Sequence, residues 1–108
     1  MYNGRMTEGW TEITDFDRLR DGALTPVFPL GLPVLLIRKG AELYALENRC
    51  AHMGCPLSLG RLDGYALTCP CHDWTFDVRT GAFAAAAELS VKTYPAELRG
   101  GKVFARIS

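Results

Sequence analysis

Two consecutive segments near the middle of the chain show the clearest hydrophobic pattern. Residues 33–38 are apolar almost throughout, as in a strand buried on both faces, and residues 42–47 alternate between apolar and polar positions. Lys39 and Gly40 supply a turn between the two segments. The pattern therefore predicts an antiparallel hairpin whose second strand leads directly to Cys50, which gives the following loop a rigid base.

The rest of the chain also divides into short segments separated by turn residues. Asp63-Gly64 predicts a hairpin turn, and Pro26 and Pro29 restrict the segment around them to the edge of a sheet. Thr14 is placed as the N-cap of a short helical turn. The four alanines at 84–87 could begin a helix, but we expect a loop that folds back beside the cysteine-containing loops. An all-β fold of antiparallel sheets follows, with strands expected at 9–13, 24–28, 33–38, 42–47, 61–62, 65–68, 75–78, 82–83, 89–98 and 102–107.

The chemistry-bearing residues gather in two loops, 50–56 and 69–74, which contain all four cysteines and both histidines of the chain. The first loop carries Cys50 with His52, and the second carries Cys69 with His72. Two thiolates and two imidazoles can bind zinc or an iron–sulfur cluster. Because each loop supplies one Cys and one His, a binuclear site is favoured. Structural zinc and a pair of disulfides are the alternatives.

The spacing C-x-H, sixteen residues, C-x-x-H resembles that of the Rieske iron–sulfur family. Residues 74–77, 80–81 and 94–95 are similar to small Rieske ferredoxins that supply bacterial oxygenases. The resemblance implies a Rieske [2Fe–2S] cluster in which two His replace two Cys on one iron. It also implies a base part, about residues 9–46 and 84–108, with an inserted cluster-binding subdomain at about 47–83.

The same resemblance assigns the ligands by position. Cys50 and Cys69 would bind the inner iron, and His52 and His72 the outer iron. With two ferric irons, two sulfides, two thiolates and neutral imidazoles, the site would carry no net charge. It would therefore accept an electron more readily than a four-cysteine cluster.

Cys55 and Cys71 remain after this assignment, one in each loop. Some Rieske proteins join the two loops by a disulfide at these positions, and we favour that pairing here. In the chain-entropy model such a cross-link stabilises the fold by roughly 3 kcal/mol. The alternative is two buried, reduced thiols.

Trp74 and Phe76 stand where respiratory Rieske proteins carry a Ser and a Tyr whose hydroxyls donate hydrogen bonds to cluster sulfurs. Neither Trp74 nor Phe76 has a hydroxyl to donate. Fewer donors leave the reduced cluster less stabilised, which predicts a potential near the low end of the Rieske range, about −150 mV. An uncharged docking patch is expected around the histidines, formed by Met53, Gly54, Pro56, Pro70 and Trp74.

Composition limits the remaining possibilities. The 108 residues suit one domain, and 12 basic residues balance 12 acidic ones, so nothing indicates binding to nucleic acid. The longest apolar run, 30–37, contains Gly31 and Pro33 and is too short to span a membrane. The first ten residues lack a signal-peptide core. We therefore expect a cytoplasmic monomer.

The resemblance implies a one-electron carrier, not an enzyme. It would accept electrons from a reductase of the flavin-containing kind and pass them to a terminal oxygenase. A small Rieske subunit of a nitrite reductase or another oxidoreductase complex is the alternative. A structural zinc module and a redox sensor that uses Cys55 and Cys71 are further hypotheses.

Overall fold

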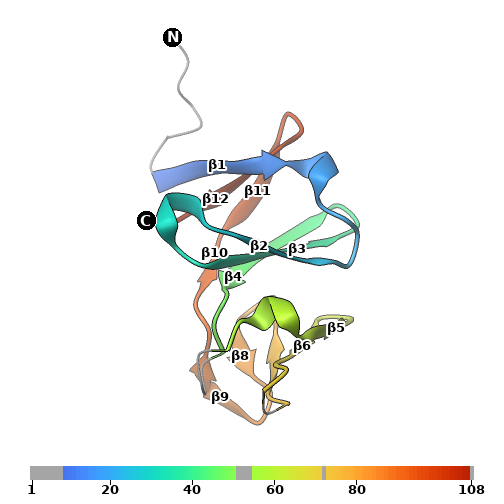
Figure 1. Cartoon of the computed structure of the whole chain (residues 1–108), viewed down its shortest axis with the longest axis vertical. Coiled ribbons are helices and arrows are strands. Elements are labelled where there is room, and N and C mark those ends of the chain that lie inside the picture. The colour runs from blue at the N-terminus through green and yellow to red at the C-terminus, as the bar shows by residue number, and fades with distance from the viewer. Residues whose placement is uncertain (1–8, 51–54, 72, 108) are drawn as a thin grey trace.

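The computed structural model describes residues 9–50, 55–71 and 73–107, and its regular structure there consists of strands and short 3-10 helices (Figure 1). The strands are paired in antiparallel fashion into three sheets. The expected all-β fold is confirmed. None of the helices in these ranges has the length and apolar character needed to cross a bilayer.

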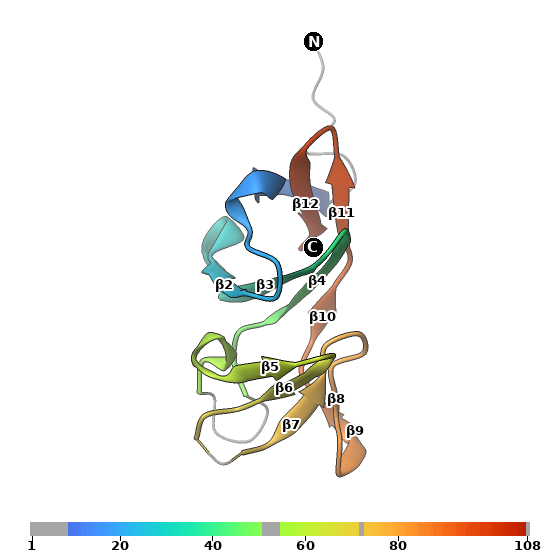
Figure 2. The same ribbon diagram turned by 90° about the vertical axis from the view of Figure 1, so that its right-hand side faces the viewer.

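The three sheets are stacked along the long axis of the molecule (Figure 2). The upper sheet has the order β1-β12-β11, the middle sheet β10-β4-β3-β2 and the lower sheet β5-β6-β7-β8-β9. Three 3-10 helices connect strands: η2 (Phe16–Arg18), η3 (Pro29–Gly31) and η4 (Leu57–Leu59). The strands are β1 (Trp10–Asp15), β2 (Leu24–Val27), β3 (Val34–Lys39), β4 (Glu42–Glu47), β5 (Arg61–Asp63), β6 (Ala66–Thr68), β7 (Thr75–Asp77), β8 (Ala82–Phe83), β9 (Ala86–Ser90), β10 (Thr93–Tyr94), β11 (Ala96–Arg99) and β12 (Lys102–Arg106).

Strand β3 lies in the middle layer and is buried on both faces, as its composition predicts. Val34 and Leu36 face the upper sheet, whereas Leu35 and Ile37 face the lower sheet. Successive side chains of a strand point to opposite faces, so one strand supplies two cores. The upper core consists of Leu19, Val34, Leu36, Ala45, Tyr94, Val103, Ala105 and Ile107. The lower core consists of Leu35, Ile37, Leu46, Cys50, Leu57, Leu67, Cys69, Phe76, Val78 and Val91.

Segment 86–99 differs from the expectation. The helix considered for the alanine run does not form, and the expected loop is reduced to a turn at Ala84 and Ala85. Ala86 pairs with Phe83, so β9 joins the lower sheet. The single strand expected at 89–98 is three strands, β9, β10 and β11, which lie in the lower, middle and upper sheets in turn. This segment therefore connects all three layers.

The expected N-cap at Thr14 is wrong. Strand β1 continues to Asp15, which precedes η2 and makes no side-chain capping bond. Its carboxylate instead accepts a hydrogen bond from Lys102 Nζ at 2.7 Å, across the β1–β12 pair. This hydrogen bond from Lys102 and the positive charge of Lys102 lower the pKa of Asp15, because both favour the charged carboxylate.

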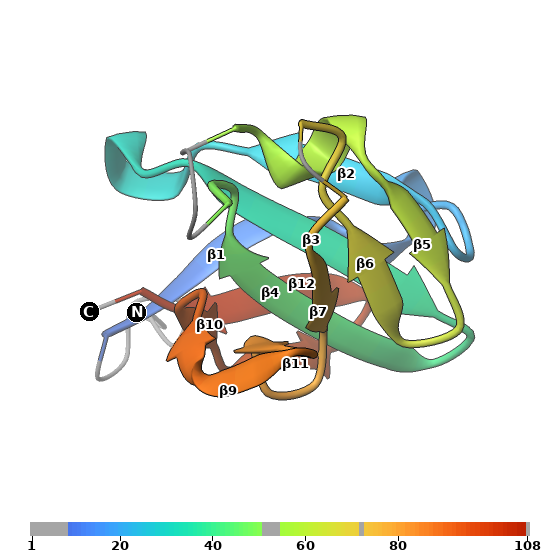
Figure 3. The same cartoon turned by 90° about the horizontal axis from the view of Figure 1, so that it is seen from below.

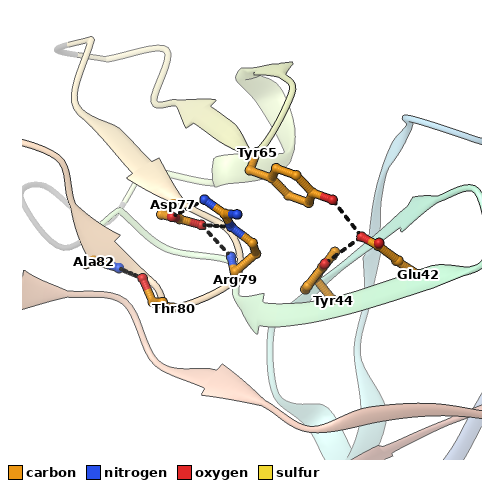
Figure 4. A network of polar contacts seen from close by, with 7 residues as sticks. All are labelled: Glu42, Tyr44, Tyr65, Asp77, Arg79, Thr80 and Ala82. Atoms are coloured by element: carbon orange, nitrogen blue, oxygen red, sulfur yellow. Dashed lines mark hydrogen bonds and ion pairs between the residues drawn. The ribbon is translucent and has the colours of Figure 1, made fainter.

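A polar network joins the middle and lower sheets (Figure 4). Glu42 Oε1 accepts hydrogen bonds from the hydroxyls of Tyr44, at 2.7 Å, and Tyr65, at 2.8 Å. The guanidinium of Arg79 lies over the Tyr65 ring, 4.3 Å from its centroid, and pairs with Asp77. The turn of the β3–β4 hairpin is thereby connected to the turns of the lower sheet.

Candidate metal centre

Two cysteines from two different sheets share the lower core. Cys50 follows β4 of the middle sheet, and Cys69 directly follows β6 of the lower sheet. Their exposed fractions are 4% and 0%. Both pack in one cluster with Leu57, Leu67 and Phe76. The β3–β4 hairpin and the lower sheet thus place two thiols in the same apolar cluster, which we call the floor of the site. Figure 3 shows the lower sheet in front of the middle one, viewed from this end.

Each loop is closed at its base by a backbone hydrogen bond that starts at its first cysteine. The amide of Cys50 donates to the carbonyl of Cys55, and the amide of Cys69 donates to the carbonyl of Trp74, both at 2.7 Å. Asp73, in the second loop, has a φ of 59°, a left-handed conformation that Asp tolerates better than most residues. In both loops, therefore, the amide of a buried cysteine bonds to the carbonyl five residues further along the chain.

A disulfide joins Cys55 of the first loop to Cys71 of the second, with the two Cα atoms 6.6 Å apart. This is the pairing that the sequence interpretation favoured. The Sγ atoms of Cys55, Cys69 and Cys71 lie within 4.8 Å of one another. Because Cys55 and Cys71 are committed to each other, Cys69 is the thiol of this group that can bind a metal.

A side chain that the sequence interpretation missed holds the first loop. Asn48 is buried, with an exposed fraction of 6%. Its Nδ2 donates to Ser58 Oγ at 3.0 Å, and its Oδ1 accepts from the Ser58 amide at 2.8 Å. The two flanks of the loop are thereby clamped together. An Asn after a strand usually indicates only a turn, so no local signal pointed to this role.

Gly60 allows the exit of the first loop to approach the entrance of the second. A Cβ at this position would collide with the carbonyl oxygen of Thr68, which directly precedes Cys69. The requirement comes from close backbone approach, since the φ of Gly60 is −87° and suits any residue. Gly60 therefore keeps the two loops side by side.

An aromatic group lies beneath the second loop. The Trp74 ring stacks on Phe83 with centroids 4.0 Å apart and planes at 4°. Phe76 lies 5.7 Å from Phe83, centroid to centroid, and is fully buried. Phe76 thus belongs to the floor of the site and not to a docking surface. None of these side chains carries a hydroxyl.

The other predicted site residues divide into two groups. Pro56 and Pro70 are exposed, and Trp74 is partly buried, so these three can contribute to a docking surface. The remaining predicted ligands and docking residues, His52, Met53, Gly54 and His72, lie outside the described residues.

Comparison with known proteins assigns the chain to a family. The Rieske [2Fe-2S] domain matches residues 9–95. The chain belongs to the Rieske [2Fe–2S] family. It is 34% identical over 104 residues to the ferredoxin component of a naphthalene 1,2-dioxygenase system of Pseudomonas aeruginosa, covering 95% of this chain and 100% of that protein.

Solved structures show the same Rieske fold. The ferredoxin of carbazole 1,9a-dioxygenase from Nocardioides aromaticivorans superposes with a TM-score of 0.86 at 28% identity, covering 94% of this chain and 100% of that one. A complex of reduced oxygenase and oxidized ferredoxin in carbazole 1,9a-dioxygenase matches with a TM-score of 0.83 at 28% identity, covering 93% of this chain and 94% of that one.

The cofactor of this Rieske chain is a [2Fe–2S] cluster. The described donors fit it, because two buried thiols share one floor while the other two cysteines are removed from ligation by their disulfide. Because the family match specifies this cluster, the structural-zinc alternative is not retained. The relatives are ferredoxin components of oxygenase systems. This indicates that the chain, like them, transfers electrons.

Proposed function

We propose that this Rieske ferredoxin carries single electrons from a flavin-containing reductase to a terminal oxygenase. The observation that carries the proposal is the pair of loops: each begins at a buried thiol, both stand on one apolar floor, and a disulfide joins them at the end of the molecule. The sequence alignment with a dioxygenase ferredoxin spans the whole of that protein, which supports the same role. The protein is then an electron-transfer component and not itself a catalyst.

The ligand assignment forms part of this proposal. Cys50 and Cys69 would bind the inner iron, and His52 and His72 would bind the outer iron. The bound cluster supplies one-electron chemistry. The chain contributes the dry floor of Leu57, Leu67 and Phe76, all fully buried, together with loops fixed by backbone bonds, so little rearrangement accompanies a change of charge.

The proposal also covers the subdomain boundaries, the oligomeric state, the location and the reduction potential. Residues 47–83 form the cluster-binding subdomain of a single Rieske domain, and pairing of β9 with β8 continues its sheet through Ser90. A monomer in the cytoplasm suits a carrier that moves between two partners. The potential lies near the low end of the Rieske range, about −150 mV, because Trp74 and Phe76 donate no hydroxyl hydrogen bonds.

A redox titration followed by EPR tests this function. The wild-type protein should give a Rieske-type signal at low potential, and reduced protein should pass its electron to an oxygenase component. Cys69→Ser should abolish the signal, whereas Cys55→Ser, the matched control in the neighbouring loop, should retain it. A signal at high potential would overturn the argument from Trp74 and Phe76, and its absence from the wild type would overturn the proposed ligands.

A further inference from the structure

Two large apolar side chains that serve no core line one groove: Phe28, just before η3, and Leu59, on η4. Their exposed fractions are 67% and 71%. We call these two residues the apolar shoulder. Scattered exposed apolar residues are ordinary on a protein surface, but two that border one groove beside a functional site indicate an interaction surface.

The shoulder borders a groove that reaches the candidate metal centre. The groove has a volume of about 440 Å³ and a mainly apolar lining. Among its described lining residues Arg49, which directly precedes Cys50, is the charged one, and Pro56 belongs to the first loop. Its other lining residues are Pro26, Phe28, Pro33, Asn48, Ser58 and Leu59. An occupant of this groove would lie directly beside the loop through which the electron leaves.

We infer that the apolar shoulder and its groove are the docking surface for the terminal oxygenase. The oxygenase places an apolar side chain in the groove and a carboxylate against Arg49. Continuity of the groove with the first loop and the single positive charge at that junction favour an electron-transfer partner of this chemistry. A related ferredoxin forms a complex with its oxygenase, which favours the oxygenase over the reductase. The inference rests on the proposed function and extends its contact surface along one side of the loops.

Phe28→Asn and Leu59→Asn test the shoulder. Both side chains are largely exposed, so folding should be retained. Leu98→Asn is the matched control, because Leu98 is 43% exposed and lies on β11 in the upper sheet. The acceptors are the purified oxygenase components of the naphthalene 1,2-dioxygenase and carbazole 1,9a-dioxygenase systems, and stopped-flow absorbance measures electron transfer from the reduced protein.

Each shoulder variant should raise the oxygenase concentration required for half-maximal transfer about tenfold, as expected for loss of a buried apolar contact. The EPR signal and the rate of oxidation by ferricyanide should stay at wild-type values, and Leu98→Asn should behave as wild type. Arg49→Gln should weaken docking at low ionic strength and have less effect at high salt.

The outcomes separate this inference from the proposed function. If wild-type protein reduces neither oxygenase, the proposed function fails and the inference fails with it. If wild-type protein reduces an oxygenase and the shoulder variants do so equally well, only the inference is overturned. Slower reduction of the variants by the reductase alone would assign the shoulder to that partner. If the wild type were a dimer and the variants were monomers, the shoulder would be a self-association surface. Each of these results would overturn the inference.

Discussion

The upper and lower sheets of this Rieske ferredoxin are stabilised in different ways. The upper sheet has strands of 4 to 6 residues and packs on a core of aliphatic side chains, Tyr94 and alanines. The lower sheet has strands of 2 to 5 residues, which are short for independent stability. Its core contains two cysteines, and a disulfide closes its loops. The upper sheet is an ordinary packed layer, whereas the lower one also contains a covalent cross-link.

The middle sheet makes this difference possible. Strand β3 supplies side chains to both cores, and segment 86–99 passes through all three sheets. The lower sheet therefore packs against the middle sheet, which the upper core also stabilises. Short strands can then hold loops that carry chemistry, because rigidity comes from the neighbouring layer and from covalent closure.

Replacing one buried phenylalanine in each region should give the largest effect and sharpen the comparison. Phe76→Ala removes a fully buried ring from the floor of the site and should destabilise the fold by about 3–5 kcal/mol. It should also reduce cluster content in protein that is still folded. Phe104→Ala, in β12 of the upper sheet with 4% exposure, is the matched control. Urea unfolding measures stability, and iron and acid-labile sulfide per chain measure cluster content.

Phe104→Ala should lower stability comparably while folded protein keeps its full cluster content. If Phe76→Ala and Phe104→Ala lost equal amounts of cluster, the difference between the lower and upper sheets would be contradicted, because the two regions would then respond as one unit. Normal cluster content in folded Phe76→Ala would show that the floor is not required to hold the loops.

The next largest effect should come from the disulfide. Cys55→Ser together with Cys71→Ser opens a link between residues 16 positions apart and should cost roughly 3 kcal/mol in the chain-entropy model. Because Cys71 is exposed, dithiothreitol should reproduce the loss in the wild type. A thiol count on denatured, unreduced protein is the accompanying measurement.

A thiol count above two per chain would show that the cross-link is absent from the isolated protein. That result would fit the predicted cytoplasmic location, where thiols are kept reduced. Full stability of the double variant would instead show that the lower sheet does not depend on covalent closure.

Local sequence signals predicted much of this fold. The alternating segment 42–47 is strand β4 with the predicted bounds, because alternation and the turn at Gly40, which has a φ of 62°, are both local. Asp63-Gly64 joins β5 and β6 for the same reason. The disulfide pair that the structure contains was implied by the resemblance to Rieske proteins.

The features that the sequence did not predict depend on contacts between distant segments. The alanine run becomes part of a strand because Phe83 offers a pairing partner to Ala86. The Asn48–Ser58 clamp spans the first loop and has no periodic signal. The apolar shoulder was invisible because an exposed leucine and a buried one look alike in a sequence.

The smallest effect should come from the polar network between the middle and lower sheets. Hydrogen bonds from Tyr44 and Tyr65 lower the pKa of Glu42, and the same carboxylate raises the pKa of Tyr44. The lowered carboxyl pKa contributes stability above the unfolded value of about 4.3, and this is lost as pH falls through the folded pKa. The raised tyrosine pKa contributes stability below about pH 10, and this is lost as pH rises through the folded pKa.

Glu42→Gln should therefore flatten the pH dependence of the thermal unfolding midpoint at both the acid and the alkaline end. Its effect near neutral pH should be small, since the carboxylate is exposed and screened by solvent. Glu97→Gln, at an exposed ion pair with Arg99 on β11, is the control and should leave both flanks of the curve as in the wild type. If the two variants give the same curve, the network does not couple the two sheets.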